Sequence, residues 1–190
     1  IVSYIDKDKR LLRPANYRNT PGKDYGVYVV NGHYVAVINV MCRLFMEALD
    51  DPFYCLNNIL EKIKTSYKNI IIIVDVHGEA TSEKMAIGHF LDGKVTVVVG
   101  THTHVPTADQ QILEKGTFYQ TDLGMCGDYD SVVGMKKETS IARFISKHLK
   151  LKLETANGNG TLCGVLLDID DINYKIKSYK QIKIGGRIGN

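Results

Sequence analysis

The amino-acid sequence predicts an α/β fold in which helices cover a parallel or mixed β-sheet. The run Ile70–Val74 and the run "KVTVVV" are continuous apolar segments, as expected for strands that are buried on both faces. Between them, "TSEKMAIGHFLDG" has the pattern of a short helix. Together the three segments predict a strand–helix–strand unit with two neighbouring parallel strands.

Length and composition indicate an ordinary globular protein. The chain has 190 residues, of which 44% are hydrophobic and 24% are charged, and its formal net charge is +3. These values allow one domain over residues 1–190. So small a net charge does not indicate a nucleic-acid or membrane-surface protein, and no apolar run approaches the roughly 18–20 residues that cross a bilayer. The four cysteines are scattered, which favours reduced thiols and a cytoplasmic location.

The elements before the central unit are a hairpin and a helix. Asn31-Gly32 lies between two β-rich runs and predicts a tight hairpin turn. A helix is expected from Pro52 onward, with Asp50 or Asp51 as its cap, because Pro is tolerated in a first helical turn. Its apolar residues recur at helical spacing, so one face of it should lie on the sheet.

In the second half of the chain, Thr81 or Ser82 is the expected cap of the central helix, which Gly93 should close. Lys115-Gly116 predicts another hairpin. The segment "KKETSIARFISKHL" predicts an amphipathic helix, and the remaining segments predict antiparallel strands joined by Asn- and Gly-rich turns.

Both central strands end in histidine-containing segments. The first breaks into "DVHGEA" with His77, and the second breaks into "GTHTH" with His102 and His104. Because ligands gather beyond the carboxyl ends of parallel strands, we expect these three histidines to converge on one edge of the sheet if the two strands are neighbours. Neutral imidazole is a common ligand of transition metals. The pattern therefore leaves a metal site and a polar loop as two open alternatives; in the first, Asp75 and Glu79 flank His77 as further ligands or as partners of the ligands.

Other features of the sequence are interpreted as structural. His33, His89 and His148 have no comparable context, and Cys126 is expected to be a loop residue. The basic stretch "KIKSYKQIK" is interpreted as a strand with a solvated face, so nucleic-acid binding is not expected. The chain contains neither a phosphate-binding P-loop motif nor a nucleophile elbow.

Several long segments resemble the YmdB-like metallophosphoesterases, a branch of the calcineurin-like superfamily. They are "LLRPANY", "LDDPF", "DVHGEATSEKMAIGHFLDGKVTVVVGTHTHVPTADQQIL" and "GTFYQTDLGMCGDYDSVVGM". The resemblance covers nearly the whole chain in order. It implies an α/β sandwich of mixed β-sheets flanked by helices, and a phosphodiesterase with two metal ions that acts on small phosphoesters such as 2′,3′-cyclic nucleotides.

The resemblance also implies roles for particular residues. His77 and His102 would hold one metal ion and His104 the other. Manganese or iron is the expected metal, with zinc or magnesium as alternatives. A homo-oligomer is one possible state of association. The candidates for contacts behind the metal ligands or toward the substrate are Asp75, Glu79, Thr101, Thr103 and Asp122.

The sequence departs from the family at its beginning. Family members start with G-D, G-E-N and G-N-H segments, which supply the remaining metal ligands and the proton donor, and none of these segments occurs here. We therefore expect the chain to be the C-terminal part of such an enzyme, without its N-terminal βα units and without a catalytic residue of its own. The alternative is a catalytically inactive module for protein contacts that retains part of a metal site.

Overall fold

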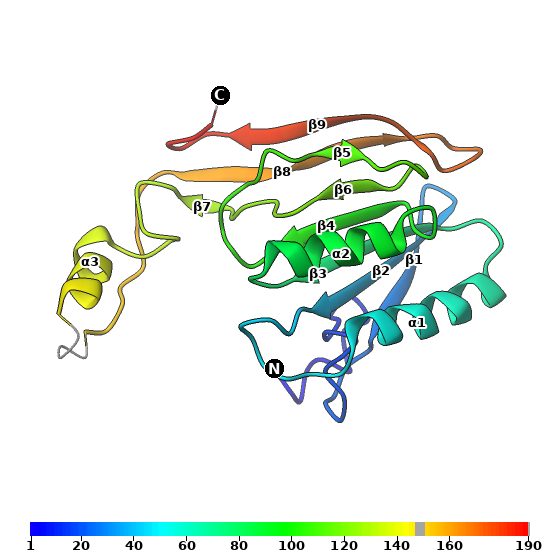
Figure 1. The fold of residues 1–190 in the computed structure, drawn as a ribbon, viewed down its shortest axis with the longest axis horizontal. Helices are drawn as coiled ribbons and strands as arrows, with labels where there is room; N and C mark the ends of the chain where they lie inside the picture. The colour runs from blue at the N-terminus through cyan, green and yellow to red at the C-terminus, as the bar shows by residue number, and fades with distance from the viewer. Residues whose placement is uncertain (147–150, 190) are drawn as a thin grey trace.

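The computed structural model describes residues 1–146 and 151–189, which form a mixed α/β fold with two β-sheets (Figure 1). The helices are α1 (Pro52–Ser66), α2 (Thr81–Leu91) and α3 (Lys137–Ile145). The strands are β1 (Tyr25–Val30), β2 (His33–Met41), β3 (Ile71–His77), β4 (Val97–Thr101), β5 (Gln111–Ile112), β6 (Phe118–Gln120), β7 (Gly127–Asp128), β8 (Gly160–Ile169) and β9 (Ile176–Ile184).

The larger sheet has the strand order β1-β2-β3-β4-β6-β5. Strands β2, β3, β4 and β6 run parallel, and β1 and β5 pair antiparallel to their neighbours. In register, Met41 lies opposite His77, and His77 lies opposite Thr101. The carboxyl ends of three adjacent strands therefore meet at one edge, which the sequence predicted for β3 and β4.

The two faces of this sheet pack against different layers. Val74 and Val98 contribute to a core with the buried residues of α1 and α2, which cover one face (Figure 1). Val97, Val99 and Phe118 point the other way and pack with residues of β8. Strands buried on both faces need continuous apolar sequence. This confirms the interpretation of the two central runs.

Helix α1 begins as the sequence predicted. The Asp51 carboxylate accepts hydrogen bonds from the backbone N–H groups of Phe53 and Tyr54, at 2.8 and 3.2 Å. These are two of the N–H groups that a helix leaves without intrahelical partners. Leu56 and Ile63 of the apolar stripe of α1 are fully buried.

The predicted cap of α2 was wrong. The helix starts at Thr81 with Ala80 as its N-cap, and neither Thr81 nor Ser82 makes a capping hydrogen bond. The acidic residue of the first turn, Glu83, instead turns its carboxylate to the backbone N–H groups of Arg43 and the next residue. A contact with a distant loop has replaced the local cap. The other end agrees with expectation, since Gly93 follows the helix with φ of 76°.

Both predicted hairpin turns are confirmed. Asn31 and Gly32 have φ values of 49° and 84°, the pair of positive angles that a tight two-residue turn between strands requires. Gly116, with φ of 100°, lies in the turn between β5 and β6.

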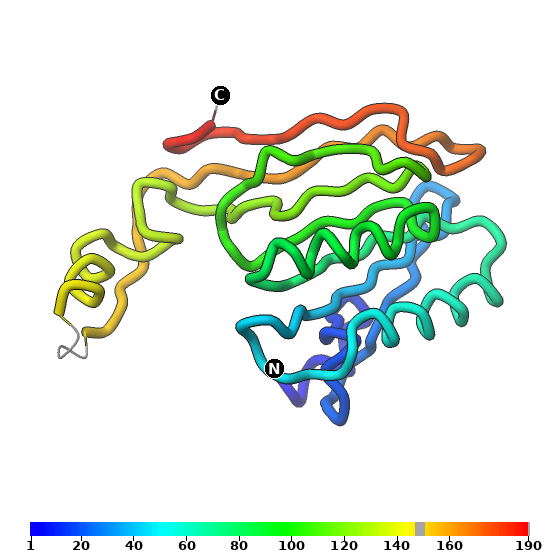
Figure 2. The backbone as a smooth tube through the Cα atoms, viewed as in Figure 1, coloured from blue at the N-terminus to red at the C-terminus, as the bar shows by residue number. Residues whose placement is uncertain are grey.

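The second sheet, β7-β8-β9, is antiparallel. Helix α3 lies apart from both sheets at the left of Figures 1 and 2, with Phe144 and Ile145 about four-fifths exposed. All four cysteines are free thiols. Within residues 1–146 and 151–189, no helix is long and apolar enough to cross a membrane.

Candidate functional site

The candidate site lies at the carboxyl ends of β3 and β4. His77 is the last residue of β3, and Thr101 is the last residue of β4. Gly100 allows the segment after β6 to pass close to the end of β4, because a Cβ atom at Gly100 would lie 1.7 Å from the carbonyl oxygen of Thr121. The backbone carbonyl of Gly100 accepts a hydrogen bond from Leu123 at 2.9 Å. The strand end and the 121–124 segment therefore touch backbone to backbone.

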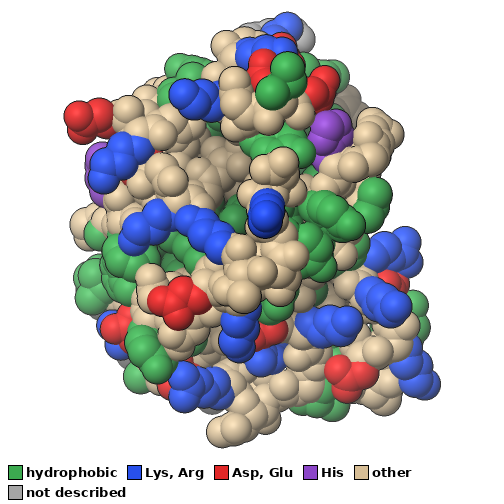
Figure 3. Space-filling model, turned by 90° about the vertical axis from the view of Figure 1, so that its right-hand side faces the viewer, with side chains coloured by type: hydrophobic (Ala, Val, Ile, Leu, Met, Phe, Trp, Pro, Cys, Tyr) green, Lys and Arg blue, Asp and Glu red, His purple; other side chains and the backbone are tan. Residues whose placement is uncertain are grey.

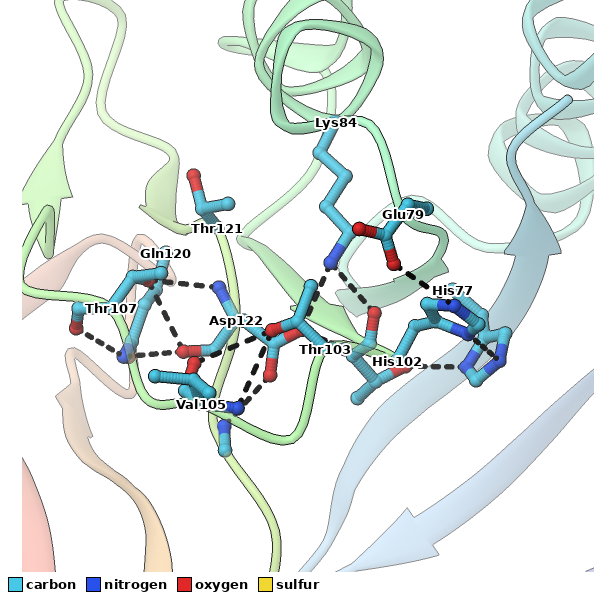
Figure 4. A network of polar contacts seen from close by, with 12 residues as sticks. His77, Glu79, Lys84, His102, Thr103, Val105, Thr107, Gln120, Thr121 and Asp122 are labelled. Carbon is cyan, nitrogen blue, oxygen red and sulfur yellow. Dashed lines mark hydrogen bonds and ion pairs between the residues drawn. The ribbon is translucent and has the colours of Figure 1, made fainter. Parts of the chain in front are cut away.

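His77 and His102 face each other across this edge. His77 Nε2 lies 3.1 Å from His102 Nδ1, with ring centroids 4.8 Å apart and ring planes nearly perpendicular. The other nitrogen of His102 lies 3.3 Å from a carboxylate oxygen of Glu79 (Figure 4). Three of the predicted site residues are thus in direct contact.

A short relay of hydrogen bonds fixes the His77 ring. Its Nδ1 lies 3.0 Å from the hydroxyl of Thr101, which donates to Asp75 at 2.8 Å. The other oxygen of that carboxylate accepts from the Asn39 side chain at 2.8 Å. Burial, followed by the neighbouring His102, lowers the pKa of His77 and favours its neutral form. A neutral imidazole oriented through its other nitrogen is the state that binds a metal.

The spacing of the two facing nitrogens fits a shared cation. Zinc–nitrogen bonds are about 2.0–2.1 Å long, so two nitrogens bound at neighbouring positions around one ion lie roughly 3.0–3.4 Å apart. The observed 3.1 Å is within this range. In the described part of the chain, however, no group of three or more His, Cys, Asp or Glu side chains is arranged to hold a metal ion. The facing nitrogens of His77 and His102 are therefore two possible ligands for a cation and, among the described residues, not a complete metal site.

The third predicted ligand, His104, is not brought to this pair. Its Nδ1 lies 3.0 Å from the carbonyl oxygen of Val133, and its own carbonyl accepts from Tyr129 at 3.2 Å. Both loop histidines have positive φ, 107° for His102 and 65° for His104. Such angles are unfavourable for residues other than glycine and are concentrated at functional sites.

A buried ion pair holds the loop that carries these histidines. Lys84 of α2 donates to the carbonyl oxygen of Thr101 at 2.7 Å and to the Asp122 carboxylate at 3.0 Å (Figure 4). Both charged side chains are essentially inaccessible to solvent. The same carboxylate accepts from the backbone N–H groups of Thr103 and Gly124, at 3.0 and 2.9 Å. Asp122 thus binds the residue between the two loop histidines.

A second layer of contacts supports this arrangement. Thr107 and Asp122 exchange backbone and side-chain hydrogen bonds, and the Gln120 amide donates to both of their carbonyl oxygens. The Asp109 carboxylate accepts from Thr121. Although burial acts in the opposite direction, these hydrogen bonds and one involving Thr107 lower the pKa of Asp109. The segment after β6 is therefore tied firmly to the histidine loop.

With this geometry established, comparison with known proteins identifies the family. A model of the YmdB-like protein family matches residues 1–182. The chain belongs to this family. A 2′,3′-cyclic-nucleotide 2′-phosphodiesterase from Bacillus subtilis is 46% identical over 187 residues, which are 97% of this chain and 69% of that protein.

Two crystal structures share the family's fold. A hypothetical protein from Thermus thermophilus superposes with a TM-score of 0.89 at 38% identity, covering 98% of this chain and 71% of that one. A structure described as a novel phosphatase from Mycoplasma pneumoniae gives 0.86 at 32% identity, covering 97% and 66%. The chain thus spans about two thirds of the length of these family members.

Sequence reasoning missed two residues of the site, Lys84 and Asn39. Lys84 shares a helical stripe with Ile87 and Leu91, both fully buried. A lysine within an apolar stripe was the available signal, because lysine is almost never buried without a partner. Asn39 gave no comparable signal, since it lies on a strand that alternates in the ordinary way.

Two of the remaining histidines, His33 and His89, lie on other elements than the facing pair, on β2 and α2. His89 is exposed on α2. His33 is partly covered, and its Nδ1 lies 3.3 Å from the Tyr174 hydroxyl. His148 is outside the described residues. Cys126, expected to be a loop residue, lies just before β7, with its thiol 3.5 Å from the carbonyl oxygen of Cys163.

Proposed function

We propose that the chain carries part of a metal-dependent phosphodiesterase site that hydrolyses phosphodiesters such as 2′,3′-cyclic nucleotides. The observation that carries the proposal is the pair His77 and His102, whose nitrogens face each other at 3.1 Å where two parallel strands end. The name of the Bacillus relative supports the substrate class. We also propose the finer fold class, a calcineurin-like sandwich, on the same grounds.

Each predicted metal ligand has a distinct place in this proposal. His77 and His102 would hold one ion, and His104 would hold a second one. Two bound divalent cations would lower the pKa of a water molecule and stabilise charge on the phosphoryl oxygens. Manganese or iron is the expected metal, with zinc or magnesium as alternatives. The remaining ligands of a two-metal centre are not provided by the contacts described above.

The chain's own residues orient the site. Thr101 and Asp75 keep the Nε2 atom of His77 directed toward His102. Lys84 and Asp122 hold the histidine loop through hydrogen bonds to the backbone of Thr101 and Thr103. Its histidines therefore do not have to be ordered when a ligand binds. The Glu79 side chain is about half exposed beside His102, where it can accept a proton or a hydrogen bond from that ring.

The wider setting is also part of the proposal. We propose that residues 1–190 belong to a single metallophosphoesterase domain in the cytoplasm, which acts on a small phosphoester or nucleotide and is independent of membranes and nucleic acids. Self-association into a homo-oligomer belongs to the same expectation. Four free cysteines support a reducing compartment.

The proposal is tested with His102→Ala in the full protein. Hydrolysis of 2′,3′-cyclic AMP with added Mn²⁺ should be abolished and the bound metal per chain should fall, while the melting temperature stays near that of the unmodified protein. His89→Ala is the matched control, because it removes an exposed histidine of α2. Undiminished turnover of the His102 variant at saturating metal would contradict the site assignment.

A second candidate function is a catalytically inactive module that retains part of a metal site for contact with another protein. The observation in its favour is that His104 is turned to Val133 instead of to the facing pair. Metal analysis separates the two. About two transition-metal ions per chain support the enzyme, and one ion or none, without turnover, supports the module.

A further inference from the structure

A pocket lies at the opposite end of the same strands from the histidines. Its volume is about 540 Å³, and it is bounded by the segments that precede β3, β4 and β6 and by the turn between β8 and β9. Seven residues of β3 at about 3.3 Å each place it roughly 20 Å from the histidine pair. Figure 3 shows this end of the molecule, with blue Lys and Arg side chains spread across it.

The charged residues that line the pocket are all positive. Five of its lining residues are lysines, and none is an aspartate or glutamate; the lysines are Lys64, Lys68, Lys94, Lys115 and Lys175. Within residues 1–146 and 151–189, none of the five forms an ion pair. Converging like charges around a hollow raise the local positive potential and attract anions.

Two carboxylates near the pocket accept hydrogen bonds from backbone N–H groups. Asp92 accepts from the backbone N–H groups of Lys115 and Thr117, at 3.0 and 3.4 Å. Asp170 accepts from those of Ile172 and Asn173, at 2.9 and 3.0 Å. These bonds shape the turns that carry two of the lysines, and among the described residues neither carboxylate forms an ion pair with a lysine of the pocket.

Aromatic side chains complete the pocket. Tyr67 packs against Tyr34 with ring centroids 4.9 Å apart, and Tyr174 packs edge-on against His33 at 5.8 Å. Tyr67 and Tyr174 both line the hollow, together with Ile70. Two partly buried rings, each held by a second ring from the start of β2, provide a surface on which a flat base can pack.

We propose that this pocket binds a nucleotide that carries at least two phosphate groups. The volume is within the roughly 300–1,000 Å³ of small-molecule sites. Lysine ammonium groups bind phosphates as mobile point charges, and several lysines around one hollow suit a ligand with several negative charges. All five lysines line this one hollow, although Lys64 and Lys94 also border a neighbouring one, and this grouping favours a small ligand over an RNA strand.

The test is calorimetric titration of the full protein with ADP in buffer containing EDTA, so that no metal is bound at the histidine edge. One ADP should bind per chain. Lys68→Glu/Lys175→Glu should weaken binding by about tenfold or more, because two attractions become repulsions. Lys62→Glu/Lys152→Glu is the matched control, since it changes the net charge equally at exposed positions outside the pocket. Circular dichroism should show the same fold in all variants.

Two further titrations identify the part of the ligand that is recognised. Inorganic pyrophosphate should bind more weakly than ADP. Tyr67→Leu should weaken ADP binding several-fold while leaving pyrophosphate binding unchanged. Equal affinity for pyrophosphate and ADP would overturn the assignment of a nucleotide.

Three other results would overturn the proposal. They are an absence of ADP binding, equal losses in the pocket variant and in the matched control, and much tighter binding of a single-stranded oligoribonucleotide than of ADP. Because His102→Ala leaves the lysines intact, it should retain ADP binding in EDTA. A failure at this pocket is thereby distinguished from a failure of the proposed phosphodiesterase site.

Discussion

The two ends of the central parallel strands are built differently. At the carboxyl ends, the charged side chains Lys84 and Asp122 are buried and fully paired, and they fix a loop with strained histidines. At the amino ends, the lysines stand around an open hollow without ion pairs in the described part of the chain, and nearby carboxylates shape turns. One edge uses its polar contacts to fix a geometry. The other leaves its lysines without ion-pair partners among the described residues, although Lys94 Nζ lies 3.7 Å from the centroid of the Phe90 ring.

This difference indicates what each edge is suited to do. Two nitrogens must be placed to within a few tenths of an ångström to share an ion, and such placement requires ligands that are held from behind. An anion is attracted by flexible ammonium groups without such accuracy. Buried polar networks therefore mark the edge where chemistry is expected, and clustered surface charge of one sign marks the edge where binding is expected.

The largest effect should come from breaking the buried pair. Lys84→Met leaves the Asp122 carboxylate buried without a cation, and we expect the free energy of unfolding to fall by about 3–5 kcal/mol. Urea denaturation measures this loss. Lys84→Met/Asp122→Asn, which also removes the negative charge, should recover part of it. A loss below about 1 kcal/mol for the single variant would show that the pair is not a structural requirement of the histidine edge.

A smaller effect should come from the relay behind His77. Thr101→Val keeps the shape of the side chain but removes the hydroxyl between Asp75 and the ring. We expect metal affinity to fall about 10–100-fold with little change in stability, because the ring loses its orienting partner. Titration with Mn²⁺ or Zn²⁺ checks this. Thr65→Val, on the exposed side of α1, should leave metal affinity unchanged.

The smallest effect should come from removing one lysine of the pocket. Lys68→Gln changes an exposed side chain that has no ion-pair partner among the described residues. We expect the free energy of unfolding to change by less than about 0.5 kcal/mol. The same denaturation experiment compares it with Lys84→Met. Losses of similar size for the two lysines would remove the distinction between the two edges.

Most of the fold could be predicted because local patterns and tertiary packing agree. Each correct prediction rests on a signal contained within a few residues: the apolar runs of β3 and β4, the Asp51 cap and the Asn31-Gly32 turn. The cap of α2 could not be predicted in this way. Its first-turn carboxylate bonds to backbone about forty residues earlier in the chain, and nothing in the local sequence reports that distance.

The candidate site was predicted in part for a similar reason. His77 ends β3 and His102 directly follows β4, so the strand ends fix the positions of both residues. The parallel pairing of the two strands then brings the side chains together. The direction of a loop side chain depends instead on its own φ and on distant partners. His104 therefore turns to Val133, which the spacing of two histidines does not reveal. Lys84 was missed because its partners, Thr101 and Asp122, come from two other segments.

Gly100 gives the histidine edge a further property. The position carries no functional group, yet any side chain there would collide with the carbonyl oxygen of Thr121. The collision partner is backbone, so it cannot be relieved by a change of rotamer. Substitutions of Gly100 should therefore not be tolerated, whereas substitutions of the lysines at the other edge should be. Over evolutionary time the histidine edge should keep its outline, and the opposite edge can change the ligands it attracts.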